Sequence, residues 1–116
     1  MATTEESSMF QFYFKIPFTE ITTFVEIQKC LTTNEFLEYV NVEVRNNLNI
    51  NSKYDVEVVD AGKPDGELAP CMEPRYDETL LQRYGNVKTI IACYARPIHP
   101  ITREFVRRDN YSDYLL

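Results

Sequence analysis

The chain has 116 residues, of which 44% are apolar and 13% are aromatic, and its net charge is −6. These values fit one globular domain with a modest core and exclude an intrinsically disordered chain. The charge is uneven, because residues 1–74 carry −8 and residues 75–116 carry +2. A mostly acidic surface repels a phosphate backbone, so we expect no nucleic-acid partner. The sequence has no apolar run long enough to span a bilayer, so we expect no membrane partner.

The first residues and the cysteines indicate the compartment. Residues 1–8 are polar and acidic, whereas a secretory signal needs a basic start and an apolar stretch, so we expect a flexible leader. The cysteines are Cys30, Cys71 and Cys93. Their odd number and wide spacing argue against a disulfide framework or a four-cysteine metal site. The sequence therefore predicts free thiols in a reducing intracellular compartment, the cytoplasm or the nucleus.

The first predicted elements form an antiparallel hairpin. Apolar and polar side chains alternate along residues 10–16, and residues 21–27 alternate again. Because successive side chains of a strand point to opposite faces, each segment predicts a strand with one buried face. The alternating positions are Phe10, Phe12, Phe14, Ile16, Ile21, Thr23, Val25 and Ile27. The short connection around Pro17 favours a hairpin.

The next segment has two interpretations. Thr32 and Glu35 have the spacing of a capping box, in which each side chain satisfies a free backbone N–H at the start of a helix. A four-residue apolar stripe follows, made of Phe36, Val40, Val44 and Leu48. The alternative is a strand, because valines also alternate at positions 40, 42 and 44 and β-branched residues weaken helices. We predict a helix over residues 33–47, ended by the asparagines that follow.

Residues 53–62 predict a third strand, with Val56 and Val58 on one face and Val59 on the other. The following residues, 62–74, hold two of the three glycines and three of the six prolines. Both residue types oppose a continuous helix or strand, so this segment predicts a long loop.

Two further elements are predicted before the tail. Residues 77–85 predict one or two helical turns, which Asp77 is expected to cap and Gly85 to end. Residues 87–96 predict a final strand that is apolar at nearly every position. That density is typical of a strand with neighbours on both sides. We therefore expect the last strand to insert into the middle of a mixed sheet, parallel to the first.

The order of these segments resembles the ubiquitin-like β-grasp family. The resemblance covers about residues 9–96, through the stretches MFQFYFKIPFTEITTFVEIQ, VVDAGKPDGE, ETLLQRYG and KTIIACYAR. It implies an α+β fold, in which a mixed four- to five-stranded sheet packs on one main helix. Residues 9–97 would then form the domain and residues 98–116 a C-terminal tail.

The residues that would carry chemistry are sparse. The last glycine is Gly85 and the chain ends SDYLL, so the C-terminal diglycine of conjugating family members is absent. The four grouped cysteines of β-grasp ferredoxins are absent too. His99 is the single histidine and lies between two prolines, while Asp60, Asp65 and Glu67 are too sparse for a calcium loop. We therefore expect no catalytic residues, no metal site and no cofactor.

The resemblance implies a shallow apolar patch on the outer sheet face, which binds protein partners. The matching positions here are Phe18, Val59 and Tyr94, with Arg96 beside them. An exposed apolar cluster rimmed by charge suits a docking site. The alternative is that Phe18 folds back on the core and Val59 is a singly exposed valine.

The tail alternates large apolar side chains with charged ones, and its candidate docking residues are Ile101, Phe105, Tyr111 and Tyr114. It could lie on the acidic body, dock elsewhere as a peptide, or fray. The sequence thus predicts a non-catalytic ubiquitin-like interaction domain, an adaptor that is a monomer alone and binds another protein. The alternative is a fixed structural subunit of a larger cellular or viral assembly.

Overall fold

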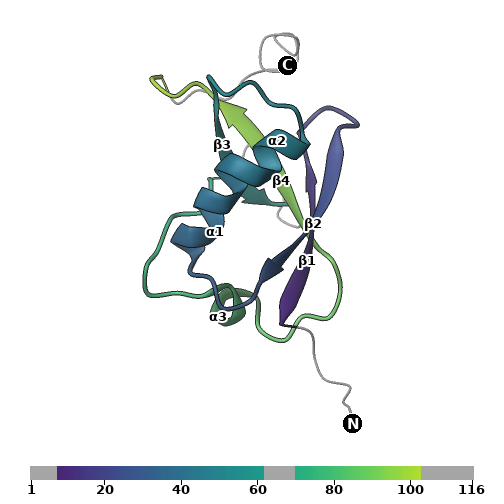
Figure 1. The fold of residues 1–116 in the computed structure, drawn as a ribbon, viewed down its shortest axis with the longest axis vertical. Helices are drawn as coiled ribbons and strands as arrows, with labels where there is room; N and C mark the ends of the chain where they lie inside the picture. Colours follow the sequence, from purple (N-terminus) through teal and green to yellow (C-terminus); the bar gives the residue numbers. More distant parts are fainter. Residues whose placement is uncertain (1–7, 62–69, 103–116) are drawn as a thin grey trace.

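The computed structural model describes residues 8–61 and 70–102. Four strands form one sheet in the order β2-β1-β4-β3 (Figure 1). Their bounds are Met9–Lys15 for β1, Thr22–Gln28 for β2, Asp55–Asp60 for β3 and Ile91–Ile98 for β4. β1 and β4 pair in parallel, and the other two pairs are antiparallel. The fold is therefore α+β with a mixed four-stranded sheet, and the last strand lies in its middle, parallel to the first, as predicted.

The last strand begins and ends later than the sequence predicts. Val87 and Ile90 precede β4, and their side chains are 36% and 48% exposed. Pro97 lies inside β4, where it is opposite Val56 of β3. A proline lacks a backbone N–H, but the pairing of β1 with β4 already ends at Tyr94, so no bond to β1 is lost there.

One helix follows the hairpin, as predicted. It consists of α1 (Thr33–Tyr39), the π-helical η1 (Val40–Val44) and α2 (Arg45–Asn47). Its capping box is formed: the Glu35 N–H donates to Thr32 Oγ1 at 3.1 Å and the Thr32 N–H donates to Glu35 Oε1 at 2.9 Å. The strand interpretation of the valine run is therefore wrong.

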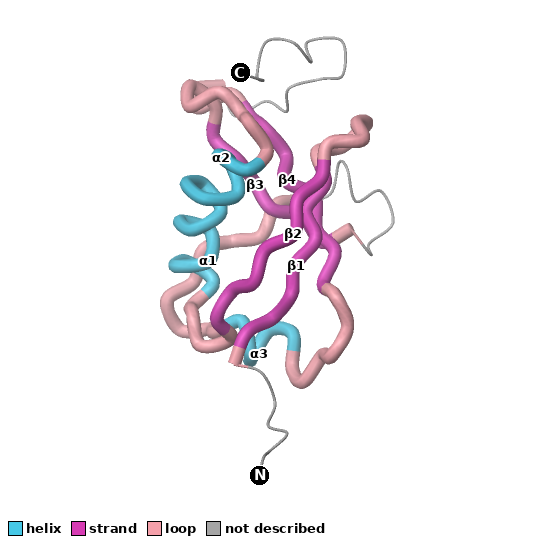
Figure 2. The backbone as a smooth tube through the Cα atoms, turned by 45° about the vertical axis from the view of Figure 1, so that its right-hand side comes forward, coloured by secondary structure: helices cyan, strands magenta, loops and turns pink. Residues whose placement is uncertain are grey.

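The helix covers one face of the sheet, and the core lies between them (Figure 2). The Phe12 ring lies 5.0 Å from the Phe36 ring and 5.7 Å from the Phe14 ring, measured between centroids. All three side chains are fully buried, as are Val40 and Val44 of the predicted helical stripe. The aromatic alternation of β1 and the four-residue period of the helix thus meet in one core.

The short helix α3 (Leu80–Tyr84) is capped by Thr79 rather than Asp77. Thr79 Oγ1 accepts from the Gln82 N–H at 3.1 Å, whereas Asp77 pairs with Arg75 at the surface. Threonine with a glutamine three residues later is a capping box, which satisfies two backbone donors instead of one. The helix ends at Gly85, whose φ of 68° suits a residue without a Cβ atom.

Candidate partner-binding face

We call the side of the sheet away from the helix the outer face. The alternation that buries Phe12 and Phe14 points Tyr13 to this face, and the register sets Tyr13 beside Phe24 of β2 and Ala92 of β4. The Tyr13 and Phe24 rings contact each other, with centroids 4.9 Å apart. Phe24 is 62% exposed. An aromatic pair therefore faces outward from the β1–β2 hairpin.

Two smaller apolar side chains extend this pair. Ala92 of β4 is exposed on the outer face, and Ile90, which directly precedes β4, is 48% exposed. We name Tyr13, Phe24, Ile90 and Ala92 the outer aromatic patch. Single exposed apolar residues are common, whereas a contiguous group over three strands is typical of a docking surface.

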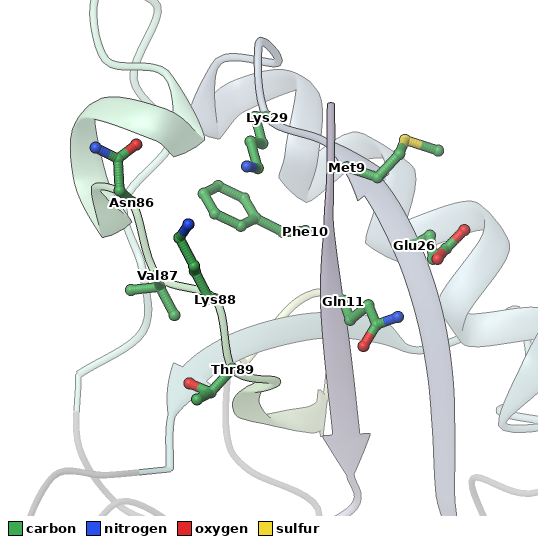
Figure 3. A pocket seen from close by; sticks show the side chains of 9 residues that line it. All are labelled: Met9, Phe10, Gln11, Glu26, Lys29, Asn86, Val87, Lys88 and Thr89. Carbon is green, nitrogen blue, oxygen red and sulfur yellow. The ribbon is translucent and has the colours of Figure 1, made fainter. Parts of the chain in front are cut away.

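Two shallow hollows lie on the β1–β2 half of the domain, and the first includes Phe24 of the patch. One has a volume of about 210 Å³ and is lined by Gln11, Phe12, Phe24, Val25 and Glu26. The other, of about 280 Å³, lies at the start of β1 against residues 86–89 (Figure 3). In it the Lys29 ammonium lies 5.0 Å from the centre of the Phe10 ring, a cation–π contact. Apolar side chains of a partner could enter the first hollow, and acidic ones would be favoured at the second.

The residues predicted for partner binding do not form one exposed patch. Phe18 is 44% exposed but lies in the hairpin turn with a φ of 66°, off the strands of the sheet. Val59 does point to the outer face, opposite Tyr94, but it is only 1% exposed, so its predicted exposure is wrong. The β3–β4 half of the outer face is thus buried where the β1–β2 half is exposed.

Arg96 is also buried rather than a charge at the rim of a patch. Its guanidinium donates twice to Glu57 Oε1, from Nη2 at 2.8 Å and from Nε at 3.2 Å. The side chains of this ion pair are 10% and 15% exposed. Charge pairing compensates the desolvation of both groups, which explains how an arginine is tolerated on a buried part of the sheet. Tyr94 is half-buried beside them.

The patch residues are ones that sequence reasoning missed. Tyr13 and Phe24 occupy the positions of each strand that the alternation assigns to solvent, and Ile90 falls within the predicted final strand, residues 87–96. One signal could have found them: each of the two paired strands carries an aromatic residue at a position that the alternation assigns to solvent.

A polar cluster joins β3 to α3 at the end of the sheet. Tyr84 Oη donates to Asp60 Oδ1 at 2.9 Å, and Arg83 Nη2 donates to Asp60 Oδ2 at 3.2 Å. Burial raises the pKa of the Tyr84 hydroxyl and that of the nearby Cys93 thiol well above their ordinary values. Both groups therefore stay protonated near neutral pH, where neither is a nucleophile or a base. These hydrogen bonds therefore connect β3 to α3.

The remaining candidates for chemistry lie apart. His99 packs its ring on Tyr54, with centroids 5.1 Å apart. Cys30 is exposed, Cys71 half-buried and Cys93 buried, and all three are free thiols. Within residues 8–61 and 70–102 no group of three or more acidic, histidine or cysteine side chains is placed to hold a metal ion.

Of the four predicted tail residues, one lies among the residues that the structure describes. Ile101 is 90% exposed, whereas Phe105, Tyr111 and Tyr114 lie outside the described residues. None of the helices in the described part of the chain has both the length and the apolar content to cross a membrane.

No protein-family model, curated protein or solved structure matches this chain.

Proposed function

We propose that the chain is a non-catalytic interaction domain of the ubiquitin-like β-grasp type, an adaptor that binds another protein. The observation that carries the proposal is the outer aromatic patch, an exposed apolar surface on a rigid sheet. The β-grasp assignment draws support from the hairpin, the helix that follows it, and the parallel pairing of β1 with β4 in the middle of the sheet.

The chemistry of the patch suits protein recognition. Aromatic side chains contribute large apolar areas at low conformational cost, and they are enriched among residues that dominate binding energy. Phe24 is held against Tyr13 on paired strands, so little side-chain entropy is lost when a partner covers it. Free thiols at all three cysteines support an intracellular, reducing compartment. We expect a monomer in the absence of the partner.

The test begins with a partner captured by the full chain from native extract and identified by mass spectrometry. The purified partner is then titrated calorimetrically with the wild type and with Phe24→Ala. We expect the substitution to weaken binding at least about tenfold, or about 1.4 kcal/mol. Val42→Ala is the matched control, because Val42 is 55% exposed but lies on the helix. Equal affinity of the wild type and Phe24→Ala would contradict the proposal, and so would failure to capture any partner.

A further inference from the structure

The two edges of the sheet differ. At β3 the backbone of Val56 is paired by the Asn41 side chain, and the Met72 N–H donates to the Val58 carbonyl at 2.8 Å. The edge of β3 is therefore covered by a side chain and by a loop, two of the ways in which proteins block the addition of a further strand. β2 forms the other edge.

The hydrogen-bond pattern shows which backbone groups of β2 face outward. The Ile16 N–H donates to Ile21 O and the Lys29 N–H donates to Ser8 O, each at 3.0 Å, on either side of the β1–β2 ladder. Paired residues of an antiparallel ladder alternate between bonded and non-bonded pairs. The residues whose N–H and C=O groups point away from β1 are therefore Thr22, Phe24, Glu26 and Gln28.

Of these outward groups, the Gln28 carbonyl accepts from the Leu31 N–H at 3.4 Å, whereas those of Phe24 and Glu26 lie farther along the strand. No described residue forms a hydrogen bond with the backbone N–H of Phe24 or Glu26. The strand reads TTFVEIQ: it has no proline and no lysine, and Glu26 is its single charge. Four of its residues are β-branched, which favours strand pairing. Within the described residues, Glu26 is thus the one feature of β2 that usually protects an edge strand, and the same strand carries Phe24.

We propose that β2 accepts an extended segment of a partner protein as a fifth strand of the sheet. This inference rests on the proposed function and names how the partner is held. Backbone bonds to Phe24 and Glu26 would supply affinity, and side chains on the outer face would supply specificity. The hollow lined by Phe24 and Glu26 lies where the added strand would project its side chains over the patch.

The side chains of β2 define the chemistry of that segment. Phe24 and Glu26 are two residues apart and point to the same face, so their partners are also two residues apart. An apolar side chain faces Phe24, and a lysine or arginine faces Glu26. Residues 1–74 carry −8, which disfavours an acidic segment, and the like charge of two acidic bodies opposes pairing β2 with β2 of a second copy.

The experiment screens the full chain against a displayed library of random nine-residue peptides. We expect the enriched peptides to alternate, with a basic residue two positions from an apolar one. A synthetic peptide of the enriched sequence is then titrated against the wild type, Glu26→Pro and the control Glu38→Lys, whose site is exposed on the helix. Glu26→Pro removes an outward N–H and costs no bond to β1, so urea unfolding should show a folded protein.

We expect Glu26→Pro to weaken the peptide at least about tenfold and Glu38→Lys to leave its affinity unchanged. Peptide binding should slow amide hydrogen exchange at Phe24 and Glu26. The inference is overturned if no peptide is enriched, if the enriched peptides do not alternate, or if Glu26→Pro binds equally well. A dimer of the full chain that Glu26→Pro dissociates would also overturn it, because a second copy would then occupy the edge.

Failure of the inference is distinguishable from failure of the proposed function. If the captured partner is weakened by Phe24→Ala but not by Glu26→Pro, the partner uses the face without adding a strand. In that case the proposed function stands and strand addition is wrong. If neither substitution weakens the partner, the proposed function fails as well.

Discussion

The side-chain amide of Asn41 pairs with both backbone groups of Val56, as a neighbouring strand would. The Val56 N–H donates to Asn41 Oδ1 at 2.9 Å, and Asn41 Nδ2 donates to the Val56 carbonyl at 3.1 Å. Asn41 lies in the π-helical turn η1, and its Nδ2 also donates to the Leu37 carbonyl. One side chain thus fastens the helix to β3 and closes that edge of the sheet.

Replacing Asn41 with leucine should destabilise the fold. The change leaves the N–H and the carbonyl of Val56 without their partner, and an unsatisfied buried backbone group costs about 1–3 kcal/mol. We expect a loss of that size in the free energy of unfolding, measured with urea. The control is Asn46→Leu, at an exposed position of the same helix. A loss no larger than that of the control would show that water replaces the amide without cost.

The helix makes a second prediction. Val44 is fully buried in the core, whereas the adjacent Glu43 is exposed. Val44→Asp buries a charge with no partner, so we expect it to unfold the domain, with a loss of about 4 kcal/mol or more. Glu43→Lys should be nearly silent. Circular dichroism and urea unfolding of both variants check this, and a folded, stable Val44→Asp protein would contradict the packing described here.

The spacing of apolar residues predicts the helix and the strands, because those residues are the ones that pack in the core. The capping box at Thr32 and the stripe through Phe36 outweighed the alternating valines, and Val42, the valine off the stripe, is indeed exposed. The π-helical turn was not predictable. It accompanies the pairing of Asn41 with Val56, a contact between residues fifteen positions apart that no local pattern encodes.

The candidate site was harder to predict than the fold. A period of two assigns Val58 and Val59 to opposite faces, but it does not say whether the outer face is covered. Val59 is buried there, while Phe24 on the same face is exposed. Which half of a sheet face meets solvent depends on the whole fold, so a resemblance over short motifs could not predict that Val59 and Arg96 are buried.

The third prediction concerns the residues that usually carry chemistry. In an adaptor, His99→Ala, Cys30→Ser and Cys71→Ser should each bind the captured partner with wild-type affinity in calorimetric titrations. Cys93→Ser is expected to lower stability, because a hydroxyl would replace a thiol that is only 1% exposed. Loss of function in a well-folded His99→Ala protein would contradict the non-catalytic proposal.

The fourth prediction concerns the tail. Arginines at 103, 107 and 108 follow an acidic body, so the tail and body should attract, although each exposed pair is worth only about 0–1 kcal/mol. β4 includes the buried Ile98, so a truncation should follow Thr102 rather than residue 97. If the tail covers the outer face, we expect residues 1–102 to bind the partner more tightly than the full chain. Abolished binding would identify the tail as the docking peptide, and unchanged affinity would contradict both roles.

The last prediction is a loss of stability at alkaline pH. Burial raises the pKa of Tyr84 above its ordinary 10.0 and that of Cys93 above its ordinary 9.0. Above those values the unfolded chain releases protons that the folded chain keeps, so the unfolded state binds fewer protons and stability falls as pH rises. Below about pH 9 both groups are protonated in the folded and the unfolded chain, so their contributions to the free energy of unfolding are present in full. Each group lowers the free energy of unfolding by at most about 1.4 kcal/mol per pH unit.

Tyr84→Phe isolates the tyrosine from the other groups that titrate at high pH. The variant lacks the bond from Tyr84 Oη to Asp60 Oδ1, so at pH 8 it should be less stable than the wild type by about 1 kcal/mol. It also lacks the proton release, so its disadvantage should shrink as the pH rises from about 10 to 11. Urea unfolding of both proteins across that range measures the difference. A difference that stays constant to pH 11 would mean that the Tyr84 hydroxyl ionises as easily in the folded chain as in the unfolded one, which its burial against Asp60 does not allow.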